Sequence, residues 1–166
     1  PQGLAIGARH ISISTCGVIE GIERFSHEPE QFTLAVSLHA ARQSTRDLLM
    51  PRVARYKLPD LKQALMRYVK KTNRRVTLEY VMIDNVNDTD RDLEALNAFC
   101  SDLLCHVNLI PINAIEGPPS QPSDPLVLDQ WVQSIQSHGK EATVRDSRGS
   151  DIDGACGQLK RTKCFT

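Results

Sequence analysis

Short runs rich in isoleucine, valine and leucine recur along the chain at intervals that suit a repeat of strand and helix. The first run, "HISIST" at 10–15, alternates polar and apolar residues, while the later runs are more continuously apolar. Continuous β-branched runs of this length are typical of strands buried in parallel sheets. We therefore predict strands at 10–15, 32–39, 76–83 and 107–113, with a shorter fifth strand at 142–145.

Segments with helical periodicity lie between these runs. Apolar residues fall on one face from Pro59 to Lys71, from Asp88 to Leu104 and from Asp124 to Gly139. Asp88 or Thr89 can cap the second helix, and the Asp–Pro pair at 124 opens the third. Alternating strands and helices predict an α/β fold with right-handed crossovers and a parallel sheet, either open or curled into part of a barrel.

Charge and length limit the classes of function. The chain has 166 residues, with 20 basic and 20 acidic side chains and a formal net charge of zero. This balance argues against a strongly basic surface that would bind nucleic-acid phosphates regardless of the base sequence. We expect two basic clusters to be solvated faces, with phosphate contact as the alternative: Arg52, Arg55 and Lys57, and Lys70, Lys71, Arg74 and Arg75.

The beginning of the chain carries two further expectations. "PQGLAIGARH" has only a brief apolar patch and does not resemble a signal peptide, and we find no run of about 18 apolar residues that would span a membrane. Because the chain starts at Pro1 without methionine and reaches a strand-like segment by residue 10, we interpret it as a fragment or a chain trimmed at its front.

Small polar residues lie at or just after the ends of four of the predicted strands. Parallel α/β folds meet their ligands at the carboxyl ends of the strands, so residues at these positions are candidates for one site. The candidates are Ser14, Thr15 and Gly17, then Ser37 and His39, then Asp84 and Asn85, and finally Asn113. A serine at a strand end is more often a turn former, but the agreement of four strands indicates a polar ligand with several hydrogen-bonding edges.

The five cysteines, at 16, 100, 105, 156 and 164, contain no CxxC pair. We expect Cys100 to be a core residue. Cys156 differs, because it lies in the polar, glycine-flanked stretch "DSRGSDIDGACGQL", where another reactant can reach its thiol. Arg145 and Arg148 precede it and could hold a phosphate or lower the thiol pKa. These residues alone also allow the alternative of an unrelated α/β enzyme with a nucleophilic cysteine, although no activating histidine or acid is evident.

Six ordered blocks, taken together, resemble a known family. The blocks are "SISTCG", "LAVSLHA", "LLMP", "EYVMIDNVND", "VNLIPIN" and "TVRDSRGSDIDGACGQL". They are similar, over roughly residues 9–159, to the carboxyl-terminal half of the radical S-adenosylmethionine RNA methyltransferases, the RlmN/Cfr family. This resemblance implies the second half of a partial (β/α) barrel with parallel strands, followed by a terminal loop that carries a cysteine.

The resemblance also implies roles for particular residues. The contacts to S-adenosylmethionine would come from Ser14, Ser37, Leu38, His39 and Asn113. Cys156 matches the cysteine that carries the methyl group as an S-methyl intermediate. Arg145 and Arg148 would support the RNA or the thiol.

Family members methylate adenine in large-subunit ribosomal RNA, and many also act on transfer RNA. Carbon 2 and carbon 8 of adenine do not attack a sulfonium methyl group directly. One S-adenosylmethionine therefore methylates the cysteine, and a second is cleaved reductively at a [4Fe-4S] cluster to give the radical that activates this methyl group. A second cysteine then resolves the protein–RNA link through a disulfide.

For this chain the resemblance implies action on 23S rRNA and on tRNA. It further implies a flavodoxin-like electron donor, a cytoplasmic monomer and no membrane contact. "EYVMI" and "NLIPIN" favour carbon 2 over the carbon-8 chemistry of resistance-type members.

Parts of the family pattern do not occur in this sequence. The CxxxCxxC motif that binds the cluster is absent, as are the resolving cysteine and the amino-terminal RNA-binding region. We expect these upstream of Pro1, so residues 1–166 would be the carboxyl-terminal part of the core domain and 146–166 its cysteine loop. On this interpretation the chain alone neither holds a cluster nor turns over. The alternative is a non-catalytic remnant or RNA-binding module.

Overall fold

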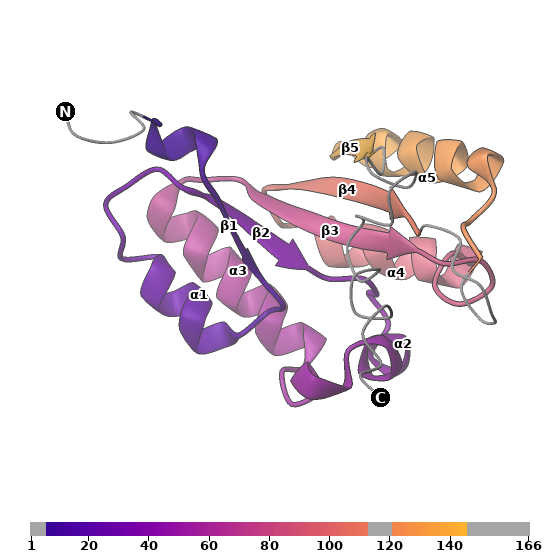
Figure 1. Cartoon of the computed structure of the whole chain (residues 1–166), viewed down its shortest axis with the longest axis horizontal. Coiled ribbons are helices and arrows are strands. Elements are labelled where there is room, and N and C mark those ends of the chain that lie inside the picture. Colours follow the sequence, from indigo (N-terminus) through magenta and orange to yellow (C-terminus); the bar gives the residue numbers. More distant parts are fainter. Residues whose placement is uncertain (1–5, 113–120, 146–166) are drawn as a thin grey trace, which may run out of the picture.

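The computed structural model describes residues 6–112 and 121–145 and shows one sheet of five parallel strands in chain order (Figure 1). The strands are β1 (Ser12–Thr15), β2 (Thr33–Ser37), β3 (Val76–Met82), β4 (Cys105–Pro111) and β5 (Glu141–Val144). The predicted α/β class is therefore confirmed, including the short fifth strand.

Helices connect successive strands. They are α1 (Ile19–Phe25), α2 (Gln43–Leu49), α3 (Leu58–Thr72), α4 (Asp90–Cys100) and α5 (Pro125–Ser137), with 3₁₀ turns η1 (Ala8–His10) and η2 (Pro51–Val53). The two predicted caps are present: the Thr89 side chain accepts a hydrogen bond from the Asp92 amide, and that of Asp124 accepts one from Leu126. The short helices α1 and α2 were not predicted.

One face of the sheet is packed and the other is open. Val76, Leu78 and Tyr80 alternate along β3 and are completely buried, and the registers place the core residues of β2 and β4 beside them. Buried residues of α1, α3, α4 and α5 join the same core, as right-handed crossovers between strands in sequential order predict. The opposite face, which we call the open face, carries serine, threonine, asparagine and glutamate side chains. A parallel sheet that is covered by helices on one face only is typical of the wall of a barrel.

Two details of the strands and helices differ from the prediction. β4 begins at Cys105 rather than at 107, because Cys105 pairs with Val76 at the start of β3. α4 ends at Cys100, four residues before the predicted end at Leu104, and Cys100 is buried as predicted. Within 6–112 and 121–145, none of the helices combines the length and apolar character needed to cross a membrane.

Candidate functional site

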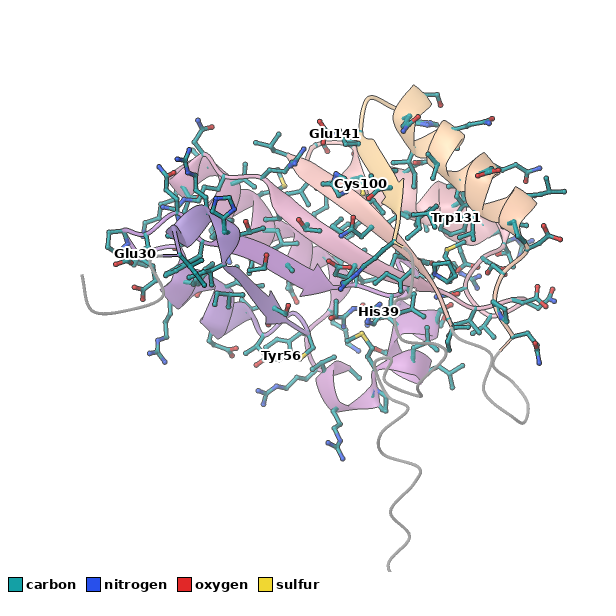
Figure 2. All side chains as sticks on the ribbon, turned by 45° about the horizontal axis from the view of Figure 1, so that its top comes forward. Glu30, His39, Tyr56, Cys100, Trp131 and Glu141 are labelled. Carbon is teal, nitrogen blue, oxygen red and sulfur yellow. The ribbon has the colours of Figure 1, made fainter. Side chains whose placement is uncertain are left out.

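The carboxyl ends of the five strands meet at one edge of the sheet, which we call the carboxyl edge. The structure brings Ser14, Ser37 and His39 toward this edge from two adjacent strands, because Ser14 pairs with Ala35, two residues before Ser37. Figure 2 shows His39 close to the end of β2. Both serines lie on the open face. The Leu38 side chain is completely buried, so only its backbone is available to a ligand.

The turn after β1 is held by its own hydrogen bonds and by a buried arginine. Thr15 Oγ1 accepts hydrogen bonds from the amides of Gly17 and Val18 at 3.2 and 3.3 Å. Gly17 has φ of 93°, in the left-handed region. From α2, Arg46 donates through Nη2 to the Cys16 carbonyl at 2.9 Å. This bond ties the Ser14–Gly17 turn to the helix that follows β2.

Arg46 is the most unusual charge among the described residues. Its side chain is completely buried, and its Nε and Nη1 atoms have no hydrogen-bond partner among these residues. Burial lowers the Arg46 pKa, although an arginine this basic still carries its charge at neutral pH. The guanidinium also acts on His39, whose pKa it helps to lower. A fixed positive charge therefore lies behind the carboxyl edge.

His39 adopts a backbone conformation that non-glycine residues rarely occupy, with φ of 55°. Its Nδ1 accepts a hydrogen bond from the Val81 amide at 3.2 Å, so the proton of the neutral ring is on Nε2. A hydrogen bond between the ring and the Glu79 backbone also acts on the imidazole and partly opposes the lowering of its pKa. Burial, reinforced by Arg46, lowers the His39 pKa to about 4, and the ring is a neutral hydrogen-bond donor at physiological pH.

His39 should make the folded protein sensitive to acid. Its folded pKa of about 4 lies below the ordinary value of 6.5, so on acidification the unfolded chain takes up the proton first. The stabilisation is complete above about pH 6.5 and is lost as the pH falls toward 4, amounting to about 3 kcal/mol. Urea unfolding at a series of pH values measures it.

The control is His39→Asn, because asparagine tolerates positive φ and can accept the Val81 amide. Carboxyl groups titrate equally in both proteins, so the difference between them isolates the imidazole. Wild-type protein should lose about 3 kcal/mol more than His39→Asn between pH 7 and 4. Parallel loss in the two proteins would show that His39 is not a buried neutral ring.

A polar network crosses the open face below these residues. Asn108 Nδ2 donates to Glu79 Oε1 at 3.1 Å, and Thr143 Oγ1 donates to Asn108 Oδ1 at 2.7 Å. His106 Nε2 lies 2.8 Å from Asn108 Oδ1 and 2.9 Å from Thr143 Oγ1. Glu79 Oε2 is buried without a hydrogen-bond partner among the described residues, although Glu79 is the register partner of Ser37. The open face thus has a hydrogen-bond acceptor, Glu79 Oε2, that is available to a ligand next to Ser37.

Other predicted candidates have different surroundings. Asp84 and Asn85 follow β3 as exposed turn residues, and Asn85 donates to the Asp84 carboxylate at 2.8 Å. Arg145 comes directly after β5, is exposed, and its amide donates to the Leu109 carbonyl at 2.8 Å, so β5 ends at the same carboxyl edge. The predicted site residues Asn113, Arg148 and Cys156 lie outside the described residues.

The second basic cluster lies at the opposite end of the sheet from the candidate site. Arg74 and Arg75 precede β3, where Arg75 pairs with Glu141 and Arg74 donates to the Pro29 carbonyl at 3.3 Å. Three residues of the first cluster are exposed: Arg52, Arg55 and Lys57. We keep the interpretation of these clusters as solvated faces.

The described cysteines provide no cluster site. Cys100 and Cys105 are buried, and Cys16 is half-buried beside the carboxyl edge. Within the described ranges, no three His, Cys, Asp or Glu side chains are arranged to hold a metal ion. The residues that the structure describes therefore do not fit an iron–sulfur cluster.

Sequence reasoning missed Arg46, Glu79 and Asn87. Asn87 is completely buried at the carboxyl edge, and its side chain bonds to the His39 carbonyl. None of the three carries a periodicity or spacing signal, because arginine and asparagine in polar stretches usually indicate surface helix and turn. Glu79 and Asn87 both belong to the block "EYVMIDNVND", which carries the family resemblance but gives no sign of their geometry.

A one-sided parallel sheet with a polar carboxyl edge is the architecture of a barrel-type enzyme half, and solved structures assign it more closely. A radical SAM methyltransferase from Sphaerobacter thermophilus matches with a TM-score of 0.89 and 46% identity, over 94% of this chain and 46% of that one. A domain of the pyruvate-formate lyase-activating enzyme from Bacteroides vulgatus shares the fold, with a TM-score of 0.61 and 14% identity over 81% of this chain and 80% of that domain. The fold is that of radical SAM enzymes.

The sequence relatives are more specific. Probable dual-specificity RNA methyltransferases RlmN are 41% identical over 96% of this chain in Clostridium perfringens and 45% identical over 96% in Moorella thermoacetica. No protein-family model matches the sequence. The chain is homologous to the RlmN-type radical SAM methyltransferases over almost its whole length, which confirms the resemblance predicted from the sequence blocks. It spans about half the length of the curated relatives it matches, 46% and 45% of these two.

Proposed function

We propose that this chain is the carboxyl-terminal part of a radical SAM methyltransferase that methylates carbon 2 of adenine in 23S rRNA and in tRNA. The observation that carries the proposal is the identity of 41–45% with RlmN-type RNA methyltransferases across 96% of the chain. The polar carboxyl edge, in a fold shared with a radical SAM methyltransferase, supports it.

In this proposal the carboxyl edge binds S-adenosylmethionine. Its adenosine part needs both donors and acceptors, and the edge offers the hydroxyls of Ser14 and Ser37 and the Nε2–H of His39. Leu38 would contribute through its backbone, and the buried Oε2 of Glu79, which lacks a partner among the described residues, adds an acceptor beside Ser37. The residues present thus fit the cofactor, which when bound supplies the methyl group. Asn113 completes the proposed contacts.

Cys156 is the proposed methyl carrier. β5 ends at Val144 at the carboxyl edge, Arg145 follows directly, and Cys156 comes eleven residues after Arg145. A stretch of that length reaches at most about 36–40 Å, so the thiol has enough chain to meet a ligand bound at this edge. Arg145 and Arg148 would attract RNA phosphates or stabilise the thiolate, which is the nucleophilic form of cysteine.

The remaining parts of the proposal concern groups for which the described residues offer no site. The [4Fe-4S] cluster of the family, the resolving cysteine and the RNA-binding region would belong to other parts of the protein, since the described residues do not fit a cluster. We propose a cytoplasmic monomer reduced by a flavodoxin-like donor. The second candidate is a carbon-8 methyltransferase, and the third is a non-catalytic remnant.

Nucleoside analysis distinguishes these candidates. The full-length gene is expressed in cells that lack their own adenine-C2 methyltransferase, and purified 23S rRNA and tRNA are digested to nucleosides for mass spectrometry. We expect 2-methyladenosine to rise from background to near one residue per target site in both RNAs. Empty vector is the control, and 8-methyladenosine would instead assign the second candidate. Unmodified RNA from cells with cluster-loaded protein would contradict the proposed activity.

A further inference from the structure

The amide side chain of Asn87 uses its hydrogen-bonding groups on the backbone around the carboxyl edge. It is completely buried in the turn between β3 and α4. Its Nδ2 donates to the carbonyls of His39 at 2.7 Å and Val81 at 2.6 Å, and its Oδ1 accepts the Ile83 amide at 2.8 Å. Both amide protons are therefore used, and each goes to a carbonyl at the end of the sheet.

These bonds lie where the pairing of β2 with β3 stops. The last registered pair is Ser37 with Glu79, and the next two amides, of Leu38 and His39, both turn to the Glu79 carbonyl at 2.9 and 3.2 Å. His39 then leaves the strand with φ of 55°, and the Leu38 carbonyl accepts the Ala40 amide at 2.7 Å instead of an amide of β3. Just beyond this point Asn87 Nδ2 bridges the His39 and Val81 carbonyls.

The same two residues are also joined through the imidazole, because the Val81 amide donates to His39 Nδ1 at 3.2 Å. The Val81 amide thus orients the His39 ring through a hydrogen bond. The Nδ2 atom of Asn87 binds the carbonyls of both Val81 and His39. A non-glycine residue stays at positive φ only where surrounding contacts over-determine it. Here those contacts come from β3, from Asn87 and from the Ala40 amide, which donates to the Leu38 carbonyl across His39 at 2.7 Å.

Asn87 is itself held from two sides. Tyr80 donates its buried hydroxyl to the Asn87 carbonyl at 2.7 Å, and the Asn87 amide donates to the Ile83 carbonyl at 3.3 Å. The side chain therefore has a fixed origin and a fixed direction. An aspartate of the same shape would place an oxygen against two carbonyl oxygens, so it cannot replace the amide.

We infer that Asn87 is a positioning residue for the ligand site: it holds His39 in its left-handed conformation and thereby aims the Nε2–H donor at the carboxyl edge. The inference rests on the proposed function for the identity of the ligand, S-adenosylmethionine. The arrangement of His39 itself does not depend on that identity. Asn87 touches neither ligand nor reacting atoms in this role.

The test uses Asn87→Asp and Asn87→Ser in the full-length protein, with Tyr80→Phe as the control. Tyr80→Phe removes a hydrogen bond to the Asn87 backbone but leaves all three side-chain bonds in place. Calorimetry gives the Kd for S-adenosylmethionine, and ¹⁵N-histidine NMR gives the tautomer of the His39 ring without ligand. Asn87→Ser removes the same donors without burying a charge, so it provides the readouts if the aspartate variant does not fold.

We expect the Kd to rise about tenfold in the Asn87 variants and to stay within about twofold of wild type in Tyr80→Phe, because two hydrogen bonds to His39 and Val81 are lost in the first case only. The His39 ring should be the Nε2–H tautomer in wild type and a tautomer mixture in the Asn87 variants. Wild-type affinity together with an unchanged tautomer in Asn87→Ser would overturn the inference, as would equal weakening by Tyr80→Phe. If wild-type protein does not bind S-adenosylmethionine but the tautomer shifts as expected, the proposed function fails and the positioning of His39 stands.

Discussion

Cys156→Ala in the full-length protein is expected to abolish methylation of RNA adenine, with a loss of a thousandfold or more. In the proposed route the thiol forms a covalent bond to the methyl group before that group reaches the base, and no other side chain can replace a covalent carrier. Removal of a group that forms the reaction intermediate typically costs on the order of a thousandfold or more in rate. Methylation of an RNA transcript with labelled S-adenosylmethionine measures the loss.

Cys164→Ala is the matched control, because it removes a thiol from the same terminal segment, 146–166. This variant should retain methylation, and both variants should bind S-adenosylmethionine as wild type does, since the proposed contacts lie elsewhere. Methylated adenine produced by Cys156→Ala at a rate near wild type would contradict the assignment of Cys156. Loss in both variants would point to the terminal segment as a whole rather than to one sulfur.

Gly17→Ala is expected to lower the free energy of unfolding by about 2–4 kcal/mol, because it adds backbone strain and a steric overlap. Gly17 has φ of 93°, and an added Cβ would lie 2.9 Å from Arg46 Nη2 and 3.1 Å from Leu61 Cδ2. Arg46 has little room to retreat, since its side chain is completely buried and Nη2 holds the Cys16 carbonyl. Denaturant unfolding measures the change.

Gly21→Ala provides the comparison. Gly21 lies in the exposed part of α1, and its added Cβ would meet nothing closer than Val18 Cγ1 at 3.8 Å. Alanine is the better helix former by about 1 kcal/mol, so this variant should be as stable as wild type or slightly more stable. Equal unfolding free energies for the two variants would show that the turn after β1 does not depend on the glycine.

Much of the fold could be predicted because local pattern and tertiary environment agree. The β-branched runs at 76–83 and 107–113 correspond to the strands β3 and β4, and the periodic segments correspond to α3, α4 and α5. The helices α1 and α2 have seven residues each, so two turns gave too short a window for a helical period to stand out. Their stability comes from packing rather than from sequence pattern.

The site was predicted in part, for a related physical reason. Ser14, Ser37 and His39 follow apolar runs, so strand ends were enough to locate them. Arg46 and Asn87 act through long-range hydrogen bonds, to Cys16 and to His39. Contacts between residues far apart in sequence produce no periodic pattern in it. Arginine and asparagine are also usually exposed, so their burial here could not be expected from residue type.

Peptide mass spectrometry on Cys156 tests the central claim most directly. The full-length protein is purified from cells with its cluster intact and digested, and the mass of the peptide carrying Cys156 is measured. The account predicts a fraction of peptide heavier by one methyl group, located on the Cys156 sulfur by fragmentation, and no methyl on Cys164. A bare thiol at Cys156 in all of the cluster-loaded protein would contradict the proposed role of this cysteine as methyl carrier.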